Sequence, residues 1–170
     1  MQKIYFILLV FLPLFNFGQI SKKWEGHYVG KLEIQSSDKT SHFHMELIFK
    51  KQDDVTYDWT IVYGEDSLRQ ERNYLLRKID AHHYEVDERN GIVLSTNLFK
   101  NTFVSVFEMQ GNLIHATYTF KKNKLYFELT SSSSSSPTGV IAPRTEDEEV
   151  VPLAHTYTTV TRQTAVLKKK

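Results

Sequence analysis

An alternation of apolar and polar residues with a period of two runs through most of the chain and constrains its fold more than any other feature. The segment from Tyr28 to Ile34 shows it, and the segments from Phe43 to Phe49 and from Tyr57 to Tyr63 repeat it. Such alternation is typical of strands that bury one face and expose the other. Because no long stretch beyond the first residues has a helical period, the sequence predicts an all-β protein.

The same reading predicts about ten strands separated by turn residues. They are expected at residues 28–34, 43–49, 57–63, 71–79, 83–87, 92–98, 102–109, 113–120, 125–129 and 157–167. Asn90-Gly91 is the clearest hairpin signal, because both residues tolerate the positive φ of a type I′ turn.

So many strands with short sequential connections favour an antiparallel up-and-down β-barrel of about 8–10 strands, which leaves no open sheet edge. A sandwich with Greek-key crossings would need more long loops than the sequence contains. An outer-membrane barrel is not expected, because the strand faces opposite the core carry Lys, Glu and Asp where a lipid belt needs apolar groups.

The amino terminus predicts a signal peptide over residues 1–18. Lys3 supplies a positive charge, and the apolar run from Ile4 to Phe15 is too short to span a bilayer as a helix, which takes about 20 residues. We therefore expect a single barrel domain over residues 19–170, without a membrane span, that is soluble in the periplasm or secreted.

One segment interrupts the strand pattern. A polyserine run over Ser131 to Ser136 is followed by prolines and by the acidic cluster from Glu146 to Glu149. Such a composition buries little apolar surface, so we expect a flexible loop over residues 130–152. Because a β-branched tract follows it, the loop is interpreted as an insertion within the one domain.

Composition excludes several classes of function. The chain has no cysteine, so disulfides, thiolate zinc sites, cysteine nucleophiles and a lipid-modified amino terminus are excluded. The formal net charge is +1, from 21 basic and 20 acidic residues, which gives no reason to expect a nucleic-acid partner. We expect a monomer, and nothing in the sequence indicates a cofactor.

The segment Trp24-Glu25-Gly26-His27-Tyr28-Val29-Gly30 opens the first strand of this antiparallel meander. It resembles the start of lipocalin-like, or calycin, barrels, whose first strand carries a Gly-x-Trp signature; here the tryptophan precedes the glycine. The resemblance extends from Trp24 to about Leu129 and includes the last strand. It implies a secreted barrel whose apolar interior can hold a hydrophobic small molecule.

Four residues are candidates for ligand binding: Arg72, Tyr74, Tyr63 and Trp59. An arginine that points into a barrel must be paired or must meet an anionic ligand group, because burying it alone is very costly. The alternative is an arginine on the outer surface, paired with Glu71 or with an acid on a neighbouring strand. The aromatic residues could either fill the interior or line a cavity.

His42-x-His44-x-Glu46 is a weak candidate for a metal site. On a strand these side chains share one face at intervals of about 6.6 Å, and imidazole and carboxylate are zinc ligands. Because Phe43, Met45 and Leu47 claim the core face, solvent exposure is the favoured interpretation, and no metal site is predicted.

No motif for a nucleophile, a nucleotide or a catalytic metal is present. The leading hypothesis is a lipocalin-like barrel that binds a hydrophobic or amphipathic small molecule. The alternatives are a barrel enzyme of lyase or isomerase type that uses lumen Arg and Tyr residues, and a non-catalytic interaction module that uses the acidic loop and the Lys168-Lys169-Lys170 tail.

Overall fold

The computed structural model describes residues 20–134, 139–141, 145–146, 149–150 and 154–170. The predicted signal peptide over residues 1–18 lies outside the described residues. Within them, no helix is long and apolar enough to cross a membrane.

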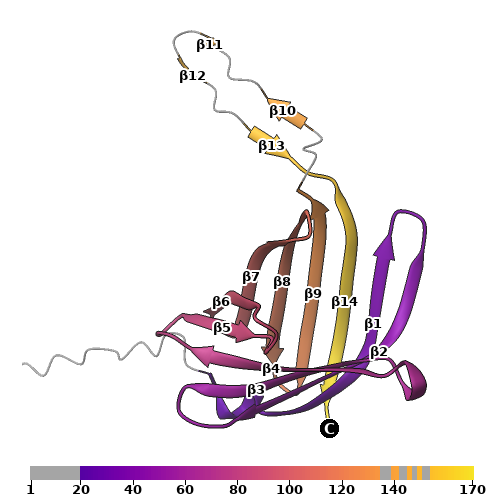
Figure 1. Cartoon of the computed structure of the whole chain (residues 1–170), viewed down its shortest axis with the longest axis vertical. Helices are drawn as coiled ribbons and strands as arrows, with labels where there is room; N and C mark the ends of the chain where they lie inside the picture. The colour runs from indigo at the N-terminus through magenta and orange to yellow at the C-terminus, as the bar shows by residue number, and fades with distance from the viewer. Residues whose placement is uncertain (1–19, 135–138, 142–144, 147–148, 151–153) are drawn as a thin grey trace, which may run out of the picture.

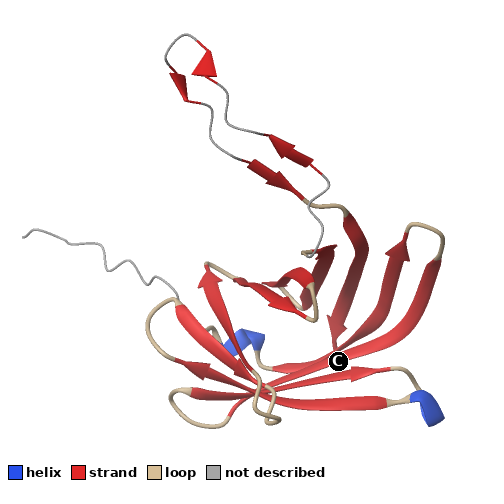
Figure 2. Ribbon diagram, turned by 45° about the horizontal axis from the view of Figure 1, so that its top comes forward, coloured by secondary structure: helices blue, strands red, loops and turns tan. Residues whose placement is uncertain are grey.

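Strands dominate the fold (Figures 1 and 2). The barrel strands are β1 (Gly26–Ser36), β2 (Thr40–Lys51), β3 (Thr56–Tyr63), β4 (Gln70–Lys78), β5 (His83–Asp87), β6 (Val93–Phe99), β7 (Thr102–Met109), β8 (Asn112–Lys121), β9 (Lys124–Ser133) and β14 (Thr159–Lys169). Two short 3-10 helices accompany them, η1 (Lys22–Trp24) and η2 (Asp66–Leu68).

The ten barrel strands form one closed antiparallel sheet in which each strand pairs with its neighbours in the chain, and β14 closes the ring between β9 and β1. This confirms the predicted up-and-down barrel. We call the end at η1 and the β2–β3 turn the closed end, and the end at the β3–β4 and β5–β6 connections the mouth.

Along most strands, the side chains that were expected to face the core are buried. Met45, Leu47 and Phe49 are completely buried inside the barrel. Phe43, which shares their face, is 45% exposed. The pairing of β2 with β3 ends at Met45 opposite Tyr63, so Phe43 lies beyond the point where β3 covers β2.

The prediction of a type I′ turn at Asn90-Gly91 is wrong, although β5 and β6 do form the expected hairpin. Positive φ angles occur at Arg89 (58°) and Gly91 (95°), and Asn90 has none. The Asn90 side chain instead accepts a hydrogen bond from the backbone N–H of Ile92 at 2.9 Å. The connection is therefore longer than a two-residue turn.

The predicted loop over residues 130–152 begins too early. Residues 130–133 continue β9, because Thr130 and Ser131 pair with β8 on one side and with β14 on the other. Two short ribbons then project beyond the mouth (Figure 1). They pair β10 (Gly139–Ile141) with β13 (Ala154–Thr156) and β11 (Thr145–Glu146) with β12 (Glu149–Val150). Residues 135–138, 142–144, 147–148 and 151–152 of the predicted loop lie outside the described residues.

Aromatic side chains fill the closed end. Trp24 of η1 stacks on Phe120 with ring centroids 5.1 Å apart, and the Tyr28 hydroxyl donates to the Trp24 carbonyl at 2.8 Å. Phe120 also meets Phe49 at 5.5 Å, and Phe103 meets Trp59 at 5.5 Å. Since Trp24 comes from outside the sheet, η1 acts as a plug for this end of the barrel.

Candidate functional site

The mouth half of the barrel contains a cavity of about 330 Å³. It is lined by Trp59, Ile61, Tyr63, Arg72, Tyr74, Val86, Glu88, Leu94, Ser105, Phe107, Ala116, Tyr118, Leu129 and Gln163. The inward positions at this level include small side chains such as Ser105 and Ala116, whereas large rings occupy the closed end. The interior is thus packed at one end and hollow at the other.

All four predicted pocket residues line this cavity. Strand pairing explains why they meet, because Trp59 on β3 lies opposite Tyr74 on β4 and Ile61 lies opposite Arg72. Tyr63 follows on the same face of β3. The order along the two strands places Trp59 and Tyr74 deeper than Tyr63 and Arg72.

Trp59 and Tyr118 separate the cavity from the aromatic packing below. Their ring centroids are 4.9 Å apart in an edge-to-face arrangement. Trp59 is 2% exposed and contacts Phe103 and Phe49 on its other side. The cavity therefore has an aromatic floor that is packed from below, and it opens toward the mouth.

Arg72 lies at the rim, where its side chain is exposed yet lines the cavity. The pKa of Arg72 is raised by a hydrogen bond to Tyr74 and by the charge of Glu88, among other neighbours. Glu71, the outer-surface partner considered from the sequence, instead pairs with Arg69 at 2.6 Å. Arg72 is therefore directed to the cavity and its tyrosines.

Burial is the main cause of the shifted pKa values of the cavity tyrosines. It raises the pKa of Tyr63 to about 12, and it raises the pKa of Tyr118 well above its ordinary value. The pKa of Tyr74 is raised by burial too, although its hydrogen bond to Arg72 acts in the opposite direction. These hydroxyls stay protonated at neutral pH and can donate hydrogen bonds to a ligand.

Sequence reasoning missed Glu88, Tyr118, Ser105 and Gln163 as cavity residues. Glu88 stands next to the turn residues Arg89 to Gly91, where solvent exposure is the usual expectation, yet it continues the face of Tyr84 and Val86 one step past the end of β5. Gln163 likewise continues the inward face of β14 that Ala165 and Leu167 form. Extending each apolar face by two residues would have found both.

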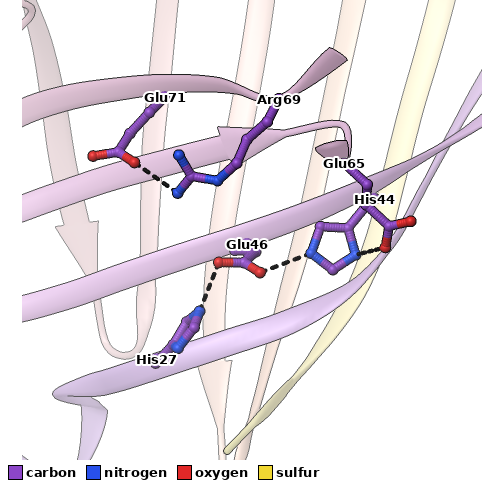
Figure 3. A network of polar contacts seen from close by, with 6 residues as sticks. All are labelled: His27, His44, Glu46, Glu65, Arg69 and Glu71. Carbon is purple, nitrogen blue, oxygen red and sulfur yellow. Dashed lines mark hydrogen bonds and ion pairs between the residues drawn. The ribbon is translucent and has the colours of Figure 1, made fainter. Parts of the chain in front are cut away.

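The weak metal candidates do not converge. His42 turns to Glu33, with 3.1 Å between Nε2 and Oε2, whereas Glu46 lies between His27 and His44 at 2.8 Å from each (Figure 3). Among the residues that the structure describes, no group of three or more His, Asp or Glu side chains is arranged to hold a metal ion. Each of these histidines is paired with a carboxylate, His42 across the strands and His44 with Glu46 on its own strand.

The Glu46 network joins three elements on the outer face of the barrel (Figure 3). The second ring nitrogen of His44 lies 2.9 Å from Glu65, in the β3–β4 connection. Partial burial raises the pKa of Glu46, but hydrogen bonds from His44 and His27 outweigh it and leave that pKa below its ordinary value. The network therefore ties β1 and β2 to the connection that borders the mouth.

A larger hollow of about 870 Å³ lies at the closed end. Its lining includes Lys22, Glu25, Lys51 and Asp54, and the last two form an ion pair at 2.8 Å. Small-molecule sites are mostly apolar with few polar groups, so the mouth cavity fits that description better.

No protein-family model and no curated protein matches the sequence. Among solved structures, the barrel is similar to a DUF3598-family protein of unknown function from Nostoc punctiforme, with a TM-score of 0.57 and 9% identity over 87% of this chain and 48% of that one. The chain thus spans about half the length of the Nostoc protein. It is also similar to Rv2717c from M. tuberculosis, with a TM-score of 0.50 and 10% identity over 88% of this chain and 94% of that one. At these identities the likeness shows the barrel fold alone.

Proposed function

We propose that the protein is a lipocalin-like barrel that binds a small apolar or amphipathic molecule in the mouth cavity. The carrying observation is a cavity with an aromatic floor, mainly apolar walls and a few polar side chains, of which Arg72 lies at the rim. Its volume, about 330 Å³, lies at the lower end of the range for ligand pockets. The ligand's apolar part would rest on Trp59, with its polar end toward the mouth.

Arg72 is the proposed anchor for an anionic head group. A guanidinium at the rim of an apolar pocket offers donors to a carboxylate or sulfonate, and Tyr74 and Tyr63 supply protonated hydroxyls beside it. Glu88 lines the same cavity and offsets part of the positive charge, so a monoanion fits better than a polyanion.

The pKa values of the tyrosines favour a binding function over the alternative, which is a barrel enzyme. That alternative predicts titrating groups with shifted pKa values in the cavity, and the shifts are present. Because burial raises the pKa of Tyr63 and Tyr118, neither supplies a tyrosinate base at neutral pH. Their hydroxyls suit the recognition of a polar ligand group.

The test is fluorescence titration of the purified protein with anilinonaphthalene sulfonate, an apolar monoanion. We expect saturable binding that changes the emission of Trp59. Ala116→Phe, which fills the cavity from β8, should abolish binding. Val106→Phe is the matched control, because Val106 on the neighbouring strand β7 points outward and is 60% exposed.

Saturable binding that survives Ala116→Phe in a folded variant would place the site elsewhere and refute the proposal. Absence of binding in the parent protein, together with no small molecule in native mass spectra of protein purified from its own host, would refute it as well.

The proposal includes action outside the cytoplasm, supported by the apolar segment from Ile4 to Phe15 and the preceding Lys3. Amino-terminal sequencing of the exported protein tests it, with cleavage expected after Gly18.

A further inference from the structure

A dense positive surface lies on the closed end, away from the mouth cavity. Lys121, Lys122, Lys124, Lys168 and Lys169 line one hollow of about 510 Å³ together with Asn123 and Tyr126. The β8–β9 hairpin supplies three of these lysines, at the end of β8, in the turn and at the start of β9, and the end of β14 supplies two. We call these five lysines the basic surface.

Strand pairing holds like charges together there. Lys124 lies opposite Lys121 on β8 and opposite Lys168 on β14. Like charges in directly opposed positions destabilise a sheet. Within the described part of the chain, no ion pair joins Lys121, Lys124 or Lys168 to a carboxylate.

Arg162 on β14, by contrast, is neutralised, because it pairs with Glu128 on β9 at 2.9 Å. Lys169 is held by its own chain, since its Nζ donates to the Lys23 carbonyl at 3.0 Å and lies 5.9 Å from the Tyr28 ring centroid. The repulsion on the basic surface is therefore left for an external anion to relieve.

An apolar pair borders the lysines. Tyr126 and Val166 lie opposite each other on β9 and β14, one step along the outer face from Lys124 and Lys168, and are 39% and 47% exposed. A tyrosine ring with a polar tip suits the boundary between lipid and water, and lysine stems can extend along an apolar surface to keep their charge in the head-group region.

From these observations we propose that the basic surface docks on a lipid membrane that carries anionic head groups. Lysines near such a surface are attracted by its negative potential, and the apolar pair adds contact with the acyl boundary. A soluble polyanion fits less well, because the chain as a whole has a formal charge of only +1 and a polyanion makes no use of Tyr126 and Val166. Docking at the closed end leaves the mouth accessible, so this proposal is independent of the ligand proposed above.

The test is co-sedimentation of the purified protein with vesicles of phosphatidylcholine alone or mixed equally with phosphatidylglycerol. We expect binding to the mixed vesicles only, weakened by salt. Replacing Lys121, Lys124 and Lys168 with glutamine should lower the affinity about 100-fold, at about fivefold per lysine. The matched control replaces the exposed Lys39, Arg69 and Arg89 with glutamine, which removes the same charge at the mouth end of the barrel, and should change affinity little.

Absence of binding to the mixed vesicles at low salt would overturn the proposal, and so would an equal loss in the two triple variants. Tyr126→Ser distinguishes the kind of partner. Weaker vesicle binding by this variant supports lipid docking. Unchanged vesicle binding, together with retention on heparin that the Lys121, Lys124 and Lys168 variant loses, would identify a soluble polyanion as the partner instead.

Discussion

Arg72 sits where an apolar cavity meets solvent, and its surroundings decide what it can do. It is exposed, so holding its charge costs little, and it lines the cavity together with Tyr74 and Glu88. The type of residue alone did not settle this, because neighbouring residues on a strand face opposite ways. The cross-strand position opposite Ile61 supplies the missing information.

Arg72→Met should weaken binding of anilinonaphthalene sulfonate about tenfold, because a charged hydrogen bond at an exposed rim is lost. Binding of N-phenylnaphthylamine, which lacks the sulfonate, should stay the same. Fluorescence titration of both probes measures the difference. An equal weakening of the two probes would show that Arg72 shapes the cavity without recognising the anion.

Glu46 should make the stability of the fold depend on pH in the acid range. Its pKa in the folded protein is below the ordinary value of 4.5, so its carboxylate stabilises the fold above that value and the contribution is lost as the pH falls through the folded pKa. Glu46→Gln should therefore be less stable than the parent at neutral pH, and the gap should close in acid. Urea unfolding at several pH values measures it.

Asp66→Asn, at an exposed position of η2, is the control and should show no such gap. A gap for Glu46→Gln that stays constant down to about pH 3 would mean that packing, and not ionisation, links Glu46 to stability.

Among the elements, the short helix η1 is expected to contribute strongly to the stability of the fold, because its Trp24 closes one end of the barrel. Trp24→Ala should destabilise the fold by about 2–3 kcal/mol, somewhat less than a fully buried tryptophan, because Trp24 is only partly buried. Trp24→Phe should recover part of the loss by stacking on Phe120. Urea unfolding of both variants, with the exposed Lys23→Ala as control, tests this; equal stability of Trp24→Ala and the parent would refute the role of the plug.

The insertion between β9 and β14 should be dispensable for the barrel. Ser132 pairs directly with Thr159, so residues 135–157 can be replaced by a short glycine-rich turn. We expect equal or slightly higher thermal stability, since shortening a loop lowers the entropy cost of closing it. Thermal unfolding and probe titration measure the outcome, and loss of folding would show that the insertion supports the sheet.

The elements predictable from sequence were those with two dissimilar faces. Alternation located every barrel strand, because Leu47 and Glu46 differ in what they gain from burial. The hairpin at Asn90 was located but not its geometry, because Asn90 can cap the turn through its side chain as well as adopt positive φ. The start of the polyserine run was misjudged, because backbone pairing of Ser131 to Ser133 with the neighbouring strands orders residues that have little β tendency of their own.

For the whole molecule, aromatic content did not reveal whether the interior is open. Whether the interior is open depends on which aromatic side chains lie at the same height along the barrel axis, and strand register sets that height. Phe120 and Phe49 meet at the closed end, whereas Ala116 and Ser105 face each other near the mouth. Four cavity residues could be proposed from their positions in the alternating pattern of two strands. The volume of the cavity between them could not be predicted.

The buried tyrosines should make the barrel sensitive to alkali. Burial raises the pKa of Tyr63 and of Tyr84 from 10.0 to about 12, so between these values the unfolded chain ionises first and stability falls as the pH rises. Tyr63→Phe should flatten this fall by at most about 1 kcal/mol per pH unit. Urea unfolding above about pH 9, with tyrosinate absorbance as a second readout, tests it; an unchanged slope would contradict the pKa assignment.

The position of β14 determines how the barrel can assemble. It is the last barrel strand in the chain, yet it pairs with β1, the first, and joins Lys169 to Tyr28. The local hairpins can form early, but the ring must wait for the most distant pairing, whose loop entropy is the costliest to overcome. Until then β1 and β9 each present an unpaired edge to other chains. We therefore expect the pairing of β14 to limit both the rate of folding and the time during which unpaired edges can cause aggregation.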